Sequence, residues 1–425
     1  MSASSEAMNA RSGTAEAAGA SPRPTLAAAR PKPTAPRHLR RYLALHDFEA
    51  AARRHLPRML YGFVSGGVET DWTLRENRAA FGDWAFIPRM LVDTSGRSTA
   101  TTLFGREYAA PFGIAPMGAS ALIAYRGDLV LAQAAAAANI PMIMSASSLI
   151  PLEEVRRNGP NTWYQAYLPG EPARIEPLVD RVAAAGFDTF VLTVDVPVSA
   201  NRENNIRNGY SIPLKPNFRL AWEGITHPRW LFGTLLRTIQ RHGMPHFENM
   251  DAGRGPPIVS RNLMRAFGER DRLNWQHLEL IRRRWKGKLV IKGVLAAADA
   301  KIARESGCDG VIVSNHGGRQ LDGAIPSLRV LPEVAAEAGG MTVMLDSGVR
   351  RGTDVLKALA LGAQFVFIGR PFLCAAALAG EEGVAHAIRL LSEEVNRDMA
   401  LLGINRLSEL GPELIRRVRG GGREG

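Results

Sequence analysis

The sequence is poor in cysteine and has no long apolar run. Its 425 residues contain two cysteines, Cys308 and Cys374, both in apolar surroundings. Such a pair gives neither a disulfide framework nor the spacing of metal ligands. No stretch reaches the roughly 18 apolar residues of a membrane-spanning helix, and no apolar segment follows a basic start at the N-terminus. We therefore expect no bound metal, no spanning helix and no secretory signal, and a reducing cytoplasm is the simplest setting.

Acidic residues are also in deficit. The chain has 53 Lys and Arg against 41 Asp and Glu, a formal net charge of +12. Such an excess is compatible with nucleic acid, a membrane surface or a small anionic substrate, and charge alone does not choose among them. Much of the excess lies in residues 1–36 and 213–270, and no RNA- or DNA-binding motif is visible. A nucleic-acid partner is therefore not expected.

The remaining composition is that of a large folded domain with a short tail. Residues 1–36 are dominated by Ala, Ser, Gly, Pro and Arg and lack aromatic residues, so we expect a flexible tail there. A hydrophobic content of 46% lets residues 37–420 bury a large core. The segment from Tyr42 to Phe81 has the pattern of amphipathic helices, with Asp47 expected as an N-cap and Pro57 near the helix end.

Eight β-rich runs alternate with Ala- and Leu-rich helical runs. Several of these runs end in polar residues, as expected of strands that are buried along their length and open into a site at the carboxyl end. The pattern predicts a (β/α)₈ TIM barrel, an α/β fold of parallel βα units. The predicted strands are 112–116, 141–146, 162–167, 189–195, 289–293, 310–316, 342–347 and 365–370.

The spacing breaks once, after the fourth predicted strand. A long insertion, about residues 207–275, separates it from the fifth. Within it, residues 213–270 are rich in aromatic residues and carry nine Lys and Arg against four acids, which indicates an irregular basic loop. A mobile lid, a subunit contact and a membrane-surface patch all remain open for it.

The predicted strand tips converge on one pocket, and two of them favour a phosphate. Glycines and arginines follow strands seven and eight in "DSGVRRG" at 346–352 and "IGRP" at 368–371, where such barrels commonly hold a phosphate. Arg350 or Arg370 would grip it bidentately. Lys292 ends an apolar strand and needs an anionic partner, which could be a reduced flavin or a structural carboxylate.

A second group of strand-tip residues favours proton transfer beside an anion. His316 could take a proton, with Asp195 at another tip fixing its ring and stabilising its cation. Arg319 and Arg202 could hold a substrate carboxylate in a fork. Each has a structural explanation when taken singly, such as a polar cap or a solvated charge. Their convergence on one barrel mouth favours the catalytic interpretation.

Several motifs resemble one family. The stretch "SNHGGRQLDG" at 314–323 is the most specific, and "WTLRENRAAF" at 72–81, "LTVDVP" at 192–197, "IKGV" at 291–294 and "LDSGVRRGTDVLKALALGA" at 345–363 accompany it. Together they resemble the FMN-dependent α-hydroxy-acid oxidising enzymes, which include L-lactate dehydrogenases, mandelate dehydrogenases and glycolate oxidases. The resemblance covers roughly residues 40–415.

The resemblance implies a role for individual residues. His316 falls on the family's catalytic base and Asp195 on the carboxylate that pairs with it. The implied substrate-binding positions are Tyr61, Tyr167, Arg202, His316 and Arg319, and both tyrosines are also expected in the catalytic set. The implied FMN positions are Ala115, Pro116, Met117, Gly118, Ser145, Gln165, Thr193, Lys292 and Ser314 around the ring, and Asp346, Arg350, Gly369 and Arg370 at the ribityl and phosphate end.

The resemblance also implies an activity and a setting. The expected reaction is oxidation of an L-2-hydroxy acid, lactate- or mandelate-like, to the 2-oxo acid, with electrons passing from FMN to a quinone or another acceptor. Gly118 is similar to the glycine of dehydrogenase members, and "THPRW" and "RHGMP" within 213–270 resemble a membrane-associating segment. We therefore expect a homotetramer at the inner face of the cytoplasmic membrane. An oxidase that makes hydrogen peroxide is the alternative, and a non-catalytic anion-binding barrel is a remote one.

Overall fold

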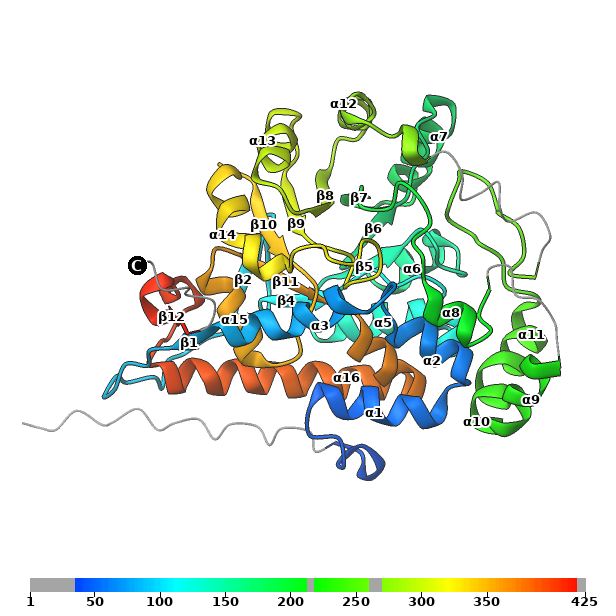
Figure 1. Ribbon diagram of the computed structural model, residues 1–425, viewed down its shortest axis with the longest axis horizontal. Helices are drawn as coiled ribbons and strands as arrows, with labels where there is room; N and C mark the ends of the chain where they lie inside the picture. Colours follow the sequence, from blue (N-terminus) through cyan, green and yellow to red (C-terminus); the bar gives the residue numbers. More distant parts are fainter. Residues whose placement is uncertain (1–34, 212–217, 260–269, 419–425) are drawn as a thin grey trace, which may run out of the picture.

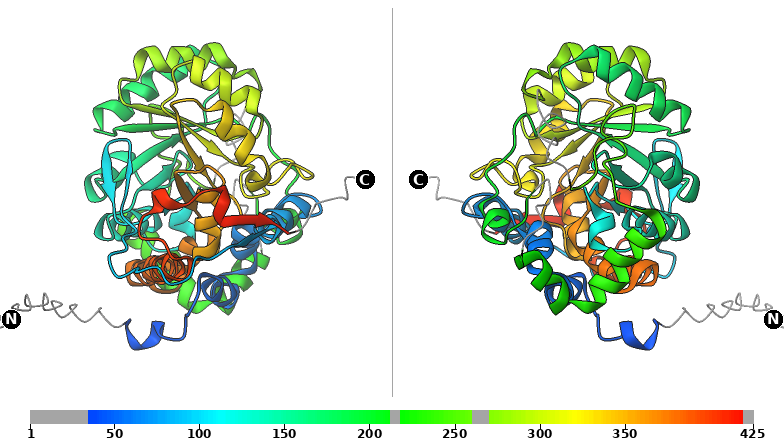
Figure 2. Two further views of the ribbon diagram at one scale, coloured as in Figure 1. Left: turned by 90° about the vertical axis from the view of Figure 1, so that its left-hand side faces the viewer. Right: turned by 90° about the vertical axis from the view of Figure 1, so that its right-hand side faces the viewer.

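Eight parallel strands form a closed barrel at the centre of the protein (Figures 1 and 2). The computed structural model describes residues 35–211, 218–259 and 270–418. The strands follow chain order around the barrel, and β11 closes it against β4. This confirms the predicted (β/α)₈ fold. The barrel strands are β4 (Phe112–Ile114), β5 (Met142–Ser145), β6 (Thr162–Ala166), β7 (Thr189–Thr193), β8 (Lys288–Val294), β9 (Gly310–Val313), β10 (Thr342–Leu345) and β11 (Phe365–Ile368).

The strands are apolar because both of their faces are covered. In β7, Val191 points into the barrel interior, whereas Phe190 and Leu192 pack against the surrounding helices. A two-stranded hairpin, β2 (Thr101–Leu103) and β3 (Arg106–Tyr108), contributes Leu103 and Tyr108 to the interior cluster. The interior is therefore a packed core, and space for a ligand remains at the carboxyl ends of the strands.

Helices surround the barrel and join successive strands. They are α4 (Ser120–Ile123), α5 (Gly127–Ala137), α6 (Leu152–Asn158), α7 (Pro172–Ala184), α12 (Trp275–Arg284), α13 (Ala297–Glu305), α14 (Ser327–Glu337), α15 (Gly352–Ala360) and α16 (Arg370–Leu402). The last of these is kinked at Ala379 and Gly380, where the backbone is not helical. A short sheet of β1 (Trp84–Phe86) and β12 (Ile415–Arg417) ties the C-terminal segment to the region before the barrel.

Three helices precede the barrel and pack beside its mouth. They are α1 (Leu45–His55), α2 (Arg58–Ser65) and α3 (Trp72–Ala79). Short 3₁₀ turns occur here and elsewhere in the described chain, at Arg37–Leu39, Ala80–Asp83, Arg270–Arg272, Leu407–Glu409 and Pro412–Leu414. The prediction that Asp47 is an N-cap is wrong, because Ala44 occupies that position. Asp47 lies one turn further on and still accepts hydrogen bonds from the amides of Leu43 and Ala44. Pro57 follows the end of α1 as expected and caps α2.

The described part of the insertion after β7 is mostly helical. It contains α8 (Glu203–Arg207), α9 (Phe218–Thr226), α10 (Pro228–Trp230), a π-helical segment (Leu231–Leu236) and α11 (Arg237–His242). The prediction of an irregular loop is therefore wrong over 218–242, which we call the helical lobe. It lies beside α1 and α2 at one end of the molecule (Figure 1). The predicted tail, residues 1–34, and the stretches 212–217 and 260–269 of the insertion lie outside the described residues.

The helical lobe carries its apolar side chains in two outward stripes. Phe218, Trp222 and Ile225 follow helical spacing along α9 and are 85%, 58% and 65% exposed. Phe232, Leu236 and Ile239 repeat the spacing and are also exposed. Trp230 is buried instead, and its indole N–H donates to the carbonyl oxygen of Leu122 on α4. Within the described residues, no helix combines the length and apolar character needed to cross a bilayer.

Candidate active site

A cavity opens at the carboxyl ends of the barrel strands. It encloses about 870 Å³ of empty space, counting the part open to solvent, which is within the usual range of small-molecule and cofactor sites. Most of the predicted site residues line it. They are Ala115, Pro116, Met117, Gly118, Tyr167, Thr193, Lys292, His316, Arg319, Asp346, Arg350, Gly369 and Arg370.

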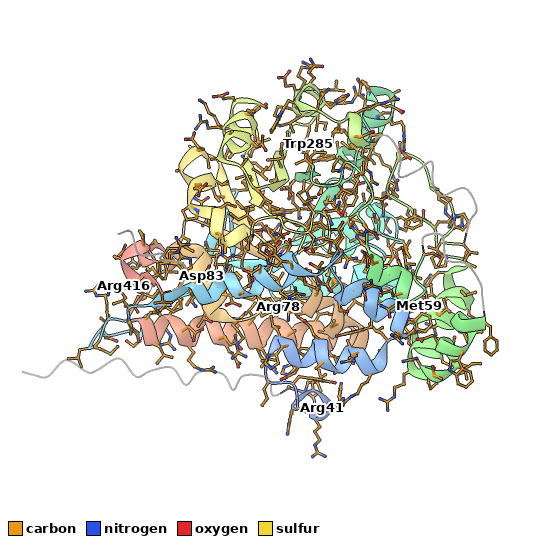
Figure 3. The ribbon with its side chains drawn as sticks, in the orientation of Figure 1. Arg41, Met59, Arg78, Asp83, Trp285 and Arg416 are labelled. Carbon is orange, nitrogen blue, oxygen red and sulfur yellow. The ribbon has the colours of Figure 1, made fainter. Side chains whose placement is uncertain are left out.

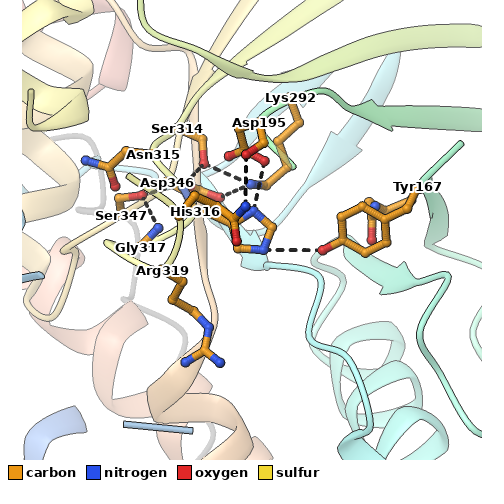
Figure 4. A network of polar contacts seen from close by, with 12 residues as sticks. Tyr167, Asp195, Lys292, Ser314, Asn315, His316, Gly317, Arg319, Asp346 and Ser347 are labelled. Atoms are coloured by element: carbon orange, nitrogen blue, oxygen red, sulfur yellow. Dashed lines mark hydrogen bonds and ion pairs between the residues drawn. The ribbon is translucent and has the colours of Figure 1, made fainter. Parts of the chain in front are cut away.

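His316 lies at the mouth between a carboxylate and a phenol (Figure 4). Its Nδ1 is 2.9 Å from Asp195 Oδ1, and its Nε2 is 3.3 Å from the hydroxyl of Tyr167. We assign the ring proton to Nδ1, because Asp195 can only accept. Nε2 then carries the free lone pair on the cavity side.

The electrostatics of this pair favour a neutral histidine. Burial lowers the pKa of His316; Asp195 raises it in part, and Lys292 and Arg202 lower it further, so the net pKa is below the usual value. Burial alone would raise the pKa of Asp195, but the neighbouring His316 and Lys292 hold it below its usual value. Asp195 is therefore ionised, and His316 is a free base at neutral pH.

The glycines after His316 allow a tight turn. His316, Gly317 and Gly318 all have left-handed backbones, with φ of 58°, 66° and 74°. A side chain on Gly318 would meet the backbone nitrogen of Leu74 at 2.5 Å, so α3 packs directly against this turn. The amide of His316 donates to the hydroxyl of Ser314, which fixes the start of the turn. At Gly318, only glycine fits both the conformation and the contact.

Lys292 is a buried cation that is fully paired. Its Nζ donates to the hydroxyl of Ser314 at 2.8 Å and lies 3.1 Å from Asp346 Oδ2. Burial would lower the pKa of Lys292, but Asp346 and Asp195 outweigh it and the net pKa is raised. The lysine therefore stays charged on the cavity wall.

Ser145 and Gln165 form a buried pair below the cavity. The hydroxyl of Ser145 donates to Gln165 Oε1 at 3.1 Å, and the side-chain amide of Gln165 donates to the carbonyl of Ala166. Both residues are almost fully buried at the tips of β5 and β6. Both are predicted FMN-binding residues, but neither of them lines the cavity.

Arg202 and Arg319 are brought together, although their guanidinium groups contact the backbone. Arg202 Nε donates to the carbonyl of Arg319, and Arg319 Nη1 donates to the carbonyls of Phe63 and Gly66 at 2.7 and 2.8 Å. Figure 4 shows Arg319 directed away from His316. Burial, and then repulsion from Arg202 and Arg370, holds the pKa of Arg319 well below its usual value. This cluster of cations therefore lacks an anion.

Tyr61 is not where the sequence analysis expected a substrate hydroxyl. It does not line the cavity and is packed against the hydrophobic core. Burial, and then Cys374 and Glu49, raise its pKa. Phe63, two residues further along α2, lines the cavity instead. Residues two apart on a helix point to nearly opposite sides. The assignment of Tyr61 to the substrate is therefore corrected.

Tyr210 is a buried tyrosine that the sequence analysis missed. Its ring stacks on Phe63 with centroids 4.5 Å apart. Burial raises its pKa, and the charges of Arg319 and Arg202 lower it, so its hydroxyl shares the region of these two arginines. No pattern around "NGY" marked it, because its role depends on the contact with Phe63.

The predicted phosphate end holds three arginines and one glutamate. Arg350 forms an ion pair with Glu49 of α1, and Arg78 Nη2 lies 2.8 Å from the same carboxylate. Arg370 donates to the carbonyls of Val64 and Gly317 at 3.0 and 2.9 Å. Burial and then Arg350 lower the pKa of Arg370 to about 10. Two positive charges remain uncompensated, which matches a phosphate monoester of about −1.5 to −2.

Two unpaired oxygens lie at the carboxyl ends of the strands, and one of them belongs to Thr193, which lines the cavity. Thr193 Oγ1 and Asp195 Oδ2 are buried and have no hydrogen-bond partner among the described residues. Such atoms are costly unless a ligand or water completes them. An elongated group with a phosphate at the arginine end and polar ring edges near Thr193 and Lys292 fits these residues, as FMN would. The described residues contain no cluster of three or more potential metal ligands.

Comparisons with known proteins agree with this geometry. The sequence model of the family described as FMN-dependent dehydrogenase matches residues 52–417. The chain is 35% identical to (S)-mandelate dehydrogenase of Pseudomonas putida over 372 residues, which are 87% of this chain and 93% of that protein. It is 38% identical to an L-lactate dehydrogenase of Stenotrophomonas maltophilia over 370 residues, 86% and 96% of the two chains.

Solved structures show the same relationship. A crystal structure of the monotopic membrane protein (S)-mandelate dehydrogenase matches with a TM-score of 0.81 and 34% identity, over 88% of this chain and 99% of that chain. A mandelate oxidase variant with (S)-mandelic acid matches with a TM-score of 0.73 and 34% identity, over 89% and 99%. The chain therefore belongs to the FMN-dependent dehydrogenase family, and its cofactor is FMN.

Proposed function

We propose that the protein oxidises an L-2-hydroxy acid to the 2-oxo acid, with His316 as the base. The observation that carries the proposal is the pair of contacts on its ring, Asp195 on Nδ1 and Tyr167 on Nε2, at the mouth of a cavity lined by buried cations. Lactate and mandelate are both suitable substrates, since the relatives include an (S)-mandelate dehydrogenase and an L-lactate dehydrogenase.

The substrate loses two hydrogens and two electrons, and His316 takes one hydrogen as a proton, either from C2 or from the hydroxyl group; bound FMN would take up the two electrons and the other hydrogen. The neutral Nε2 accepts the proton, and Asp195 stabilises the imidazolium that results. Tyr167, whose hydroxyl lies beside Nε2, orients the reacting end of the substrate. Bound FMN supplies a two-electron acceptor at the strand tips. Lys292, held charged by Asp346, would stabilise negative charge that develops on the ring.

Arg202 and Arg319 bind the substrate carboxylate. Their cluster lacks an anion, and a carboxylate would replace the neutral carbonyl partners that Arg319 has at the end of α2. Tyr210 lies behind Phe63 and places a hydroxyl near the same arginines. At the other end of the cavity, Arg350 and Arg370 would hold the FMN phosphate, with Gly369 allowing close approach.

A quinone is the proposed electron acceptor, and the membrane is its source. The two exposed apolar stripes of the helical lobe support peripheral docking of the protein on a bilayer, at the inner face of the cytoplasmic membrane. The similarity to (S)-mandelate dehydrogenase, a monotopic membrane protein, also supports docking. An oxidase is the second candidate, supported by the similarity to mandelate oxidase.

A homotetramer is also proposed, with one barrel domain in each copy. Exposed Met90, Leu91 and Leu401 support contacts between copies, because surface patches of this kind mark protein contacts. Light scattering of the FMN-loaded protein tests the assembly.

Substrate and acceptor are tested together. The purified protein is mixed anaerobically with a panel of L-2-hydroxy acids, and loss of flavin absorbance ranks them by rate. Reduced protein is then given either a quinone or oxygen. Quinone reduction without hydrogen peroxide supports the dehydrogenase, whereas stoichiometric peroxide overturns it. Absence of flavin reduction by every acid would overturn the proposed substrate class.

A further inference from the structure

A second large groove lies outside the active site, at the base of the helical lobe. It runs between α1 and the turn from α9 to α10, with about 1300 Å³ of empty space counting the part open to solvent. It shares no lining residue with the active-site cavity. Five basic side chains line it, which are Arg41, Arg54, His55, His227 and Arg229. We call it the basic groove.

The basic groove has more positive charge than its neighbours neutralise. Asp47 is the acid in its wall, and its carboxylate already accepts from the amides of Leu43 and Ala44 at 2.7 and 3.0 Å. Among the described residues, Arg54 and Arg229 are exposed and neither forms an ion pair. Both guanidinium groups are therefore available to bind an anion.

Two histidines, His55 and His227, lie beside this positive charge. His227 Nδ1 lies 2.8 Å from the carbonyl of Glu223, which orients its ring. Burial, and then the charges of Arg229 and His227, lower the pKa of His55. His55 is therefore neutral at pH 7 and contributes a hydrogen-bond donor without further charge.

Exposed apolar residues flank the groove on both sides. Leu43, next to the lining residue Tyr42, is 73% exposed, and Ile225, next to Thr226, is 65% exposed. Figure 3 shows Arg41 projecting below α1 at the edge of the molecule. If the stripes of the lobe enter the acyl region of a bilayer, the groove lies beside the level of the headgroups.

We propose that the basic groove binds the phosphate of an anionic phospholipid headgroup, with Arg54 and Arg229 as its main ligands. The inference rests on the proposed membrane docking and adds a lipid specificity to it. Charge complementarity selects an anion, and the flanking hydrocarbon selects one that is attached to a membrane. A soluble phosphate would gain nothing from Leu43 and Ile225.

The test compares vesicles of phosphatidylcholine alone with vesicles that also contain phosphatidylglycerol. The FMN-loaded full chain and its R54Q/R229Q variant are assayed by co-sedimentation. One basic residue near an anionic surface contributes roughly fivefold in affinity. We therefore expect the variant to bind the anionic vesicles roughly 25-fold more weakly than the unmodified protein, and to bind phosphatidylcholine equally. The flavin spectrum reports whether its barrel is intact.

A matched variant separates the groove from net charge. R157Q/R283Q removes two exposed arginines from α6 and α12, and it should keep its preference for anionic vesicles. An equal loss in both variants, or no loss in R54Q/R229Q, overturns the groove while leaving membrane docking in place. Displacement by inorganic phosphate beyond that by chloride of equal ionic strength would indicate a free-phosphate site and also overturn it. Binding to neither vesicle would overturn membrane docking itself.

Discussion

At the barrel mouth, Lys292 and Asp346 are buried among apolar strands, whereas on the helical lobe Phe218 and Trp222 face solvent. The first region places charge inside, and the second places hydrocarbon outside. Each arrangement is unfavourable for an isolated chain unless a partner completes it. The mouth compensates part of its charge within the chain, through ion pairs at 3.1 Å or less between Lys292 and Asp346 and between His316 and Asp195, and it leaves Arg319 and Arg370 for bound anions. The lobe has no such internal compensation for its exposed rings, which makes it the region that depends on its surroundings.

The largest expected effect is on the rate of flavin reduction, and it comes from replacing His316, the proposed base. We expect His316→Gln to slow flavin reduction by substrate about 10²- to 10⁴-fold. No other described side chain is placed to accept the substrate proton in place of Nε2. Stopped-flow absorbance measures the rate. FMN should stay bound, since the replaced ring lies on the substrate side. Rapid bleaching in the variant would contradict the assignment.

Polar substitutions on the helical lobe should weaken binding to membranes without changing the rate of flavin reduction. Trp222→Ser with Phe232→Ser removes two exposed rings, so we expect partition into vesicles to fall roughly 100-fold. Flavin reduction by substrate should be unchanged, because neither residue lines the cavity. Co-sedimentation and stopped-flow give the two values. A matched change in both would mean that the two regions are not independent.

The Asp195 carboxylate should set the pH range of activity. His316 acts as a base only when neutral, so kcat/KM is retained above its pKa and lost as the pH falls through it. The lowered pKa places this loss below pH 6.5. Asp195→Asn removes the charge that raises this pKa, so the acid limb should move roughly one unit lower while the maximum rate falls. A shift toward higher pH would contradict the role of Asp195.

Replacing Glu49 tests whether an acid of the chain itself supports the arginines at the phosphate end of the cavity. We expect Glu49→Gln to weaken FMN binding about tenfold, because Arg350 and Arg78 lose the carboxylate that holds their guanidinium groups in position. Recovery of FMN fluorescence on release measures the dissociation constant. Glu76→Gln is the control, since Glu76 pairs with Arg329 away from the cavity. Tighter FMN binding by the Glu49 variant would contradict this role.

The smallest expected effect concerns Tyr210. Tyr210→Phe keeps the stack on Phe63 and removes one hydroxyl near Arg202 and Arg319. We expect KM for the hydroxy acid to rise roughly fivefold, with kcat nearly unchanged. Tyr61→Phe should change neither constant, because Tyr61 does not line the cavity. Equal effects from both variants would mean that Tyr61 does contact the substrate.

The contrast between the two regions also explains what the sequence could predict. All eight barrel strands were located, because buried parallel strands are continuous apolar runs that end in polar tips. The convergence of His316, Asp195 and Lys292 followed from the fold, since the carboxyl ends of barrel strands meet at one face. A charged residue at the end of an apolar run therefore indicated the site through its position in the sequence alone.

Residues outside the strands were predicted less well, for a physical reason. A helical pattern says which residues share a face but not which neighbour that face meets. Tyr61 and Phe63 could not be distinguished without the position of α2 beside the cavity, and Tyr210 depends on a contact between distant segments. The spacing of Phe218, Trp222 and Ile225 indicated a helix that was interpreted as irregular, because aromatic and basic residues alternate there.

The carbonyls at the end of α2 have a consequence for the order of events. Arg319 and Arg370 are both held by carbonyl oxygens between Phe63 and Gly66. Arg319 and Arg370 point to separate ends of the cavity, so an anion bound by either arginine would replace carbonyl oxygens of the same short segment, residues 63–66, as its hydrogen-bond partner. An anion that binds one arginine would leave carbonyl oxygens of this segment without a donor. The end of α2 thus serves both arginines as a shared set of hydrogen-bond acceptors, and we expect occupancy of one end of the cavity to alter the affinity of the other.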